Sequence, residues 1–109
     1  MTVSDLLKNP AFSAVSVTDP DRTVSGVYIG DLLSWVMGRA PADSAWITIM
    51  SNVNVIAVAT LTDVSTVILA EGVVLDAEII KVASEKSVNI IASSLPAYES
   101  AMIISGILK

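Results

Sequence analysis

The side chains that most often perform catalysis are scarce in this sequence. It contains no histidine and no cysteine, which removes the commonest general base, the commonest metal ligand and the thiol nucleophile. Serine is plentiful, but a Ser-His-Asp triad cannot be built without histidine. Neither a Gly-x-Ser-x-Gly elbow nor a Ser-x-x-Lys spacing occurs. The sequence therefore predicts a protein that is not an enzyme and that carries no cofactor and no metal ion.

Three carboxylates lie near one another in the first third of the sequence: Asp19, Asp21 and Asp31. Carboxylate oxygens are ligands for hard cations such as Mg²⁺, so a metal-dependent phosphotransfer or hydrolysis reaction is one hypothesis for this region. The same residues are also typical of turns and helix starts, and this structural role is the interpretation that we prefer.

Arg22 is a candidate for recognising an anion. It is one of only two arginines, and it stands beside Asp21 in a polar turn that precedes a strand-to-helix junction. A guanidinium group and the free N–H groups of a helix start both favour negative oxygen atoms. The alternative is a structural role, in which Asp21 and Arg22 pair and order the turn.

Polar side chains also follow the strand that alternation predicts at residues 45–49. Ser51, Asn52 and Asn54 would stand at the carboxyl edge of the sheet, which is where open α/β sheets generally bind ligands. Capping of a helix is their alternative role. The residues alone therefore give a candidate ligand pocket made of Asp21, Arg22, Asp31, Ser51, Asn52 and Asn54.

Length, charge and hydropathy limit the remaining possibilities. The 109 residues suit one domain, residues 1–109. The net charge of −5 lacks the cationic footprint of a nucleic-acid binder, so we expect no nucleic-acid partner. The apolar runs are too short to cross a membrane, and residues 1–5 show no export signal. A cytoplasmic protein without membrane contact is the expectation.

The high apolar content, 53% of residues, predicts that part of the surface is a subunit interface. The expected C-terminal helix is apolar on more than one side, since Tyr98, Met102 and Ile103 lie off its main apolar line. A terminal helix of this kind favours sharing between subunits. We therefore expect a homodimer whose interface includes Tyr98, Met102 and Ile103.

Hydrophobic periodicity and turn residues predict an alternation of strands and helices. Helices are expected at 2–8, at 32–37 with Gly38 as the terminating residue, at 76–86 and from Pro96 to about 108, and strands at 12–17, 24–29, 45–49, 67–70 and 88–91. The first two strands are joined by a polar turn, and residues 52–61 fit either a strand or a helix. The predicted fold class is α/β, a single-domain sandwich with a mostly parallel or mixed sheet of about five short strands flanked by helices.

Residues 21–40, DRTVSGVYIGDLLSWVMGRA, resemble the DRTGG domain family in its small stand-alone form. The resemblance extends through residues 45–49, 54–59, 71–72 and 95–99. It implies a DRTGG-like fold similar to the N-terminal domain of HPr kinase/phosphorylase, usually dimeric, and it favours a helix at residues 54–61. DRTGG domains look regulatory or structural in phosphotransacetylases and in CBS-containing pyrophosphatases.

The resemblance adds Ser25 and Gly26 to the candidate ligand-binding residues, because they align with the glycine pair that names the family. Two departures matter. Ser25 replaces the first glycine of the pair, which weakens a contact between the backbone and an anion. Asn52 stands where relatives often have histidine, which weakens a function that needs an imidazole.

Two functional hypotheses follow. The first is a non-catalytic regulatory or accessory module that acts as a homodimer through protein contacts. Stand-alone family members resemble accessory proteins of iron-only hydrogenase and related redox systems in anaerobes, so the resemblance implies a partner in a redox or hydrogenase system. The alternative is a sensor domain that binds a nucleotide or another phosphorylated small molecule.

Overall fold

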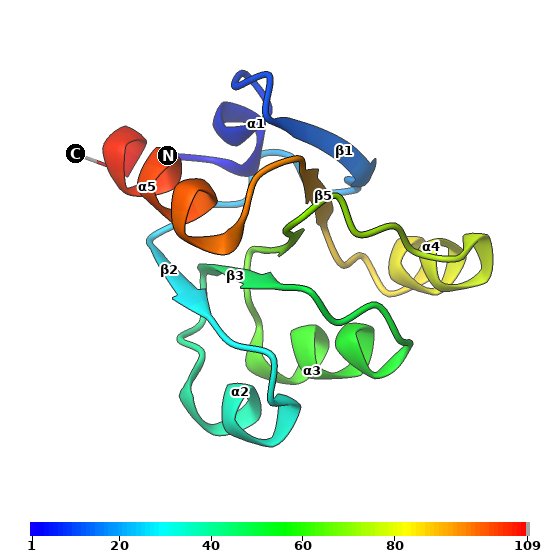
Figure 1. Cartoon of the computed structure of the whole chain (residues 1–109). Coiled ribbons are helices and arrows are strands. Elements are labelled where there is room, and N and C mark those ends of the chain that lie inside the picture. The colour runs from blue at the N-terminus through cyan, green and yellow to red at the C-terminus, as the bar shows by residue number, and fades with distance from the viewer. Residues whose placement is uncertain (109) are drawn as a thin grey trace.

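The computed structural model describes residues 1–108 as a sheet of five short strands between two layers of helices (Figure 1). The elements follow one another as α1 (Val3–Leu6), β1 (Phe12–Ser16), β2 (Gly26–Ile29), α2 (Leu33–Arg39), β3 (Ser44–Thr48), α3 (Asn54–Thr62), β4 (Thr66–Leu69), α4 (Ala77–Glu85), β5 (Ile90–Ser93) and α5 (Ala97–Leu108). The predicted α/β class with a mixed sheet is confirmed.

The sheet has the strand order β1-β5-β4-β3-β2. Strands β2 to β5 are parallel neighbours, and each is connected to the next by a helix. Strand β1 joins the far edge antiparallel to β5. The carboxyl ends of β2, β3, β4 and β5 therefore share one end of the sheet, and their amino ends share the other.

The two faces of the sheet are covered by different helices. Trp46, Val67 and Leu69 pack with side chains of α2, α3 and α4 on one face. Ile47 and Ile68 point to the opposite face, where α1 and α5 cover the sheet. Strands β3 and β4 are buried along their whole length because both faces are covered, which explains why they are nearly continuous apolar runs.

The first two strands differ from the sequence prediction. Residues 12–16 and 26–29 do not form a pair joined by a turn, because β1 and β2 lie at opposite edges of the sheet. The connecting chain is held by backbone bonds from Val24 N to Met1 O and from Val3 N to Arg22 O. The buried Asn89 accepts the N–H groups of Thr18 and Asp19 through its side-chain oxygen. These long-range contacts outweigh the local preference for a hairpin.

Two helices refine the prediction. Residues 54–62 form helix α3, which resolves the ambiguity between strand and helix in favour of the helix implied by the family resemblance. Gly38 does not terminate α2 as predicted, because the helix continues to Arg39 and is capped by Ala40. Within residues 1–108, no helix is long and apolar enough to cross a membrane.

Candidate functional site

Arg22 forms a clamp at the amino end of the sheet. Its Nε and NH2 nitrogens donate to Oδ1 of Asp43 at 3.2 and 2.8 Å, and NH2 also donates to Oδ1 of Asp63 at 3.0 Å and to the Asp63 carbonyl at 2.7 Å. Asp43 precedes β3 and Asp63 ends α3, and both have positive φ angles, 64° and 59°. One guanidinium group therefore connects two strained turns.

The Asp43 and Asp63 carboxylates neutralise the positive charge of Arg22, which is the property that would attract an anion. Hydrogen bonding to Asp43, and then the Asp63 carboxylate, raises the pKa of the guanidinium above its ordinary value, while burial acts in the opposite direction. Sequence reasoning correctly allowed a structural role for Arg22 but chose Asp21 as the partner. The true partners are 21 and 41 residues away in the chain, and no local pattern points to them.

Asp31 lies at the carboxyl end of the sheet and is bound to the neighbouring strand. Its Oδ1 atom accepts hydrogen bonds from the Thr48 hydroxyl at 2.8 Å and from the Ile49 amide at 2.9 Å. Asp31 does not cap helix α2, which has no side-chain cap. The carboxylate instead fixes the loop after β2 to the loop after β3.

The loop that follows β3 exposes Ser51 and Asn52 at the same end of the sheet, and Asn54, the first residue of α3, is exposed beside them. The Asn52 side-chain oxygen accepts the Asn54 amide at 2.9 Å, as in an Asx turn, which starts helix α3. This bond leaves the Asn52 amide NH₂ and the Ser51 hydroxyl as exposed donors at the carboxyl end.

The predicted ligand residues form two groups and not one pocket. Asp21, Arg22, Ser25 and Gly26 lie at the amino end, where Ser25 donates its amide and its hydroxyl to the Asp43 carbonyl. Asp31, Ser51, Asn52 and Asn54 lie at the carboxyl end. Strand β2 separates the two groups, and its four residues span about 13 Å.

This separation also parts the three carboxylates considered for Mg²⁺, since Asp19 and Asp21 precede β2 and Asp31 follows it. Among residues 1–108, there is no group of three or more His, Cys, Asp or Glu side chains that could hold a metal ion.

A shallow apolar groove of about 370 Å³ runs between α3 and α4. Its lining consists of Val53, Ile56, Ala57, Thr60, Leu61, Val82 and Lys86. Leu61 is 69% exposed there, and Lys86 supplies the only charge of the lining. The sequence predicted the exposed position of none of these residues.

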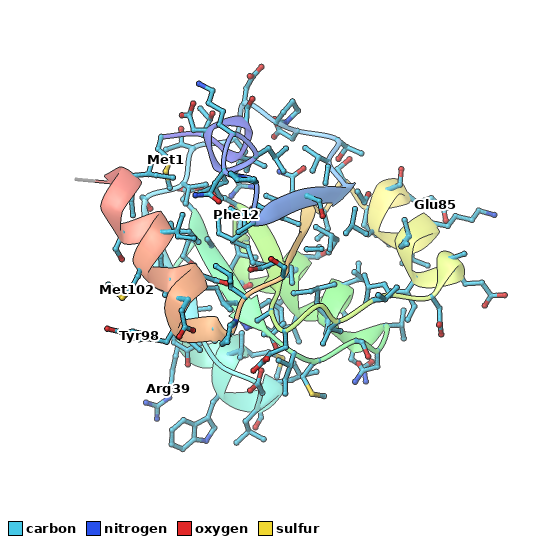
Figure 2. All side chains as sticks on the ribbon, turned by 45° about the horizontal axis from the view of Figure 1, so that its top comes forward. Met1, Phe12, Arg39, Glu85, Tyr98 and Met102 are labelled. Atoms are coloured by element: carbon cyan, nitrogen blue, oxygen red, sulfur yellow. The ribbon has the colours of Figure 1, made fainter. Side chains whose placement is uncertain are left out.

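A second group of exposed apolar side chains lies beside the edge strand β2. We call it the β2 flank, and it comprises Ile29 of β2, Leu32 and Trp35 around the start of α2, and Tyr98 and Met102 of α5. Figure 2 shows Tyr98 and Met102 pointing away from the sheet on the same side of the molecule as Arg39. Arg39 lies over the Trp35 ring, 4.2 Å from its centroid.

The three predicted interface residues divide between surface and core. Tyr98 and Met102 are 67% and 56% exposed. Ile103 is only partly buried but packs against the core cluster beneath α5. The flank therefore contains two of the three predicted interface residues, together with aromatic and aliphatic residues of α2 and β2.

Comparison with known proteins identifies the fold. A solved structure of the CBS and DRTGG domains of the regulatory region of Clostridium perfringens pyrophosphatase, complexed with the activator diadenosine tetraphosphate, matches with a TM-score of 0.74 and 15% identity. The chain has a DRTGG-like fold. The match covers 94% of this chain and 45% of that chain, so the likeness concerns less than half of the pyrophosphatase region.

The sequence resemblance to DRTGG domains and the structural match therefore agree on the fold. No family model matches the sequence, and no curated protein matches it either. At 15% identity, the match carries the architecture alone, and the bound activator is a property of the pyrophosphatase region.

Proposed function

We propose that this DRTGG-like chain is a non-catalytic regulatory or accessory module that acts as a homodimer through protein contacts. The observation that carries the proposal is the β2 flank. Twelve large apolar residues of the described chain are exposed, and five of them belong to this flank. A cluster of exposed aromatic and aliphatic side chains is typical of a protein interface.

The polar groups support a role in binding over one in catalysis. Arg22 is engaged by two carboxylates, and Asp31 is engaged by Thr48 and Ile49. The Asp31 carboxylate does lie beside the Thr48 hydroxyl, but Thr48 is buried and only 1% exposed, so a substrate could not reach this pair as the common hydrolytic mechanisms require. The sequence resemblance is the support for a further partner from a redox or hydrogenase system.

The mass of the protein in solution tests the homodimer. One chain has a mass of 11.4 kDa, so a dimer would have twice that mass, 22.8 kDa. Light scattering coupled to size-exclusion chromatography at micromolar concentration should give the higher value. A mass of one chain at every concentration up to the millimolar range would refute the homodimer.

A second candidate function is a sensor of a nucleotide or another phosphorylated small molecule. The support is the structural match to a regulatory region that is complexed with diadenosine tetraphosphate. The exposed donors of Ser51 and Asn52 at the carboxyl end would be its contacts in this chain. The Arg22 clamp, in contrast, would hold the fold and not the ligand.

Thermal unfolding with adenine nucleotides and diadenosine tetraphosphate tests the sensor. A ligand that binds only the folded protein raises the melting temperature. The sensor predicts a rise that Ser51→Ala combined with Asn52→Ala reduces, while Thr60→Ala on the remote face of α3 leaves it unchanged. No rise with any of these ligands at millimolar concentration would reject the sensor.

A further inference from the structure

Strand β2 ends the sheet, so one of its edges has no strand beside it among residues 1–108. The parallel ladder with β3 uses alternate residues of β2, as in the bond from Gly30 N to Ile47 O at 3.2 Å. The N–H and C=O groups of Val27 and Ile29 therefore point away from β3. Such a row of unpaired backbone groups is a template for another strand.

The unpaired edge lies between two helices that also expose apolar side chains. Helix α5 packs against β2 and β3 on one face of the sheet, and α2 follows β2 on the other face (Figure 1). Trp35 is 56% exposed on α2, and Tyr98 and Met102 are exposed on α5. All three layers of the sandwich thus carry an apolar surface on the same side of the molecule.

We infer that a second copy of this chain binds the β2 flank and continues the sheet, with β2 antiparallel to β2 of the partner subunit. This inference rests on the proposed homodimer and specifies its geometry. A two-fold axis perpendicular to the sheet reverses the strand direction but keeps each face on its own side. It therefore places α2 beside the partner's α2 and α5 beside the partner's α5.

The charged residues at the two ends of α2, beside the β2 flank, agree with this symmetry. Asp31 precedes α2 and Arg39 is its last residue, so two antiparallel copies of α2 bring each Arg39 toward the Asp31 of the partner subunit. In the part of the chain that the structure describes, Thr48 and Ile49 engage only the Oδ1 atom of the Asp31 carboxylate. Within residues 1–108, Arg39 stacks on Trp35 and forms no ion pair in its own chain. Charge complementarity thus acts twice across the axis.

The same layers select a second copy over an extended peptide. A peptide that added to β2 would bind the backbone groups of Val27 and Ile29, but it would reach Trp35 and Tyr98 only with its alternate side chains and would bring no helix of its own against them. A second copy presents matching apolar side chains to both helices and a matching strand to β2. In the register centred on Tyr28, each Val27 pairs with Ile29 of the partner subunit. The two residues of such a pair exchange about two backbone hydrogen bonds, so the two pairs give roughly four bonds across the axis.

A pair of matched substitutions tests the location. Trp35→Glu places a charge in the flank, and Leu61→Glu places one in the α3–α4 groove, and both residues are already exposed. Light scattering should show that Trp35→Glu raises the dimer dissociation constant by at least about tenfold, since buried tryptophan is a frequent interface anchor. Leu61→Glu should leave the constant unchanged, and circular dichroism should show both variants folded.

A wild-type dimer that Trp35→Glu leaves intact would overturn the β2 flank while keeping the homodimer, and dissociation by Leu61→Glu would do the same. A monomeric wild type would reject both proposals. The two failures are therefore distinguishable.

Cross-linking tests the pairing of the strands independently of any loss of affinity. The chain has no cysteine, so Ile29→Cys and Leu61→Cys each introduce a single thiol. In the proposed register the two Cα atoms at position 29 lie about 8 Å apart, within reach of a short bismaleimide. Cross-linked dimer should form at position 29 and not at position 61. Equal yields at both positions, or a higher yield at position 61, would overturn the pairing.

Discussion

The two edge strands of the sheet are built differently. The ladder between β1 and β5 is interrupted by a register shift between Ala14 and Ser16, and Ser13 and Ala14 are the exposed side chains of β1. The β2–β3 ladder is regular over all four residues, and β2 ends on Ile29, which is 48% exposed. One edge is irregular and lined by small side chains, and the other is regular and ends on a large apolar one.

Proteins protect free edges with bulges, charges and small or polar residues, because a regular apolar edge pairs with other chains. The β1 edge has such protection, and the β2 edge does not. The difference indicates that β1 is an edge in the functional protein, whereas β2 is completed by another chain.

The largest effect is expected at the β1 edge, from Asn89→Ala. The buried Asn89 side chain accepts the amides of Thr18 and Asp19 and donates to the carbonyls of Asp19 and Ser65. Leaving these groups unpaired should lower the free energy of unfolding by about 3 kcal/mol. Urea denaturation measures the loss. Asn54→Ala, at an exposed site, is the control and should change the free energy by less than about 0.5 kcal/mol.

Similar losses for the two asparagine variants would show that Asn89 does not hold the chain that leaves β1. The contrast between the β1 edge, where Asn89 holds the chain that follows the strand, and the unpaired β2 edge would then be lost.

A charge on each edge compares the edges directly. Ile29→Lys introduces a buried, unpaired cation if β2 pairs with a second copy, and it should weaken the dimer by about 2 kcal/mol, or roughly thirtyfold in dissociation constant. Ala14→Lys on the β1 edge should leave the dissociation constant unchanged. Analytical ultracentrifugation measures both. A weaker dimer with Ala14→Lys and an unaffected one with Ile29→Lys would exchange the roles of the two edges.

Arg22→Ala tests what holds the start of β2. The clamp is partly exposed, with 27% of the Arg22 side chain accessible, so we expect a loss of about 1 kcal/mol in the free energy of unfolding. Lys81→Ala, which removes an exposed cation that forms no ion pair within residues 1–108, is the matched control. An Arg22 variant as stable as the Lys81 variant would show that the clamp adds nothing to the fold.

The smallest effect is a pH dependence at α1, beside β1. The Thr2 amide, and then Lys8, lower the pKa of Asp5 below its ordinary 3.8. The carboxylate therefore stabilises the fold fully above that value, and this contribution is lost as the pH falls through the lower folded-state pKa. At about pH 6, the wild type should unfold at a higher urea concentration than the Asp5→Asn variant. The difference between the two unfolding midpoints should shrink as the pH falls toward about 3. A difference that grows on acidification would contradict the hydrogen bond from the Thr2 amide to the Asp5 carboxylate at the start of α1.

The sequence predicted the elements better than their neighbours. Apolar runs and turn residues located β4 and α4, because these signals are local. The position of β1 depends on its register with β5, such as Phe12 opposite Ser93, and no local pattern reports contacts between such distant residues. Gly38 was predicted to end α2 because glycine has a weak helical preference. The helix continues to Arg39, with Val36 buried against the core, and this packing is not visible in the local sequence.

The candidate site was predictable only in part. Tyr98 and Met102 were found from the periodicity of α5, and both are exposed. The division of the ligand residues between the two ends of the sheet was not found, because nearness in sequence was taken as nearness in space for Arg22 and Asp31. The partners of Arg22 are Asp43, before β3, and Asp63, after α3. Only the folded chain brings these two turns to Arg22.

Hydrogen exchange at the backbone amides of Val27 and Ile29 tests the pairing of β2 most directly. These amides point away from β3, so they exchange rapidly in a monomer and slowly when a partner strand accepts them. We predict slow exchange in the concentrated wild type and fast exchange in Trp35→Glu at the same concentration. Fast exchange of both amides in a protein shown to be dimeric would contradict the account, because the second chain would then bind elsewhere.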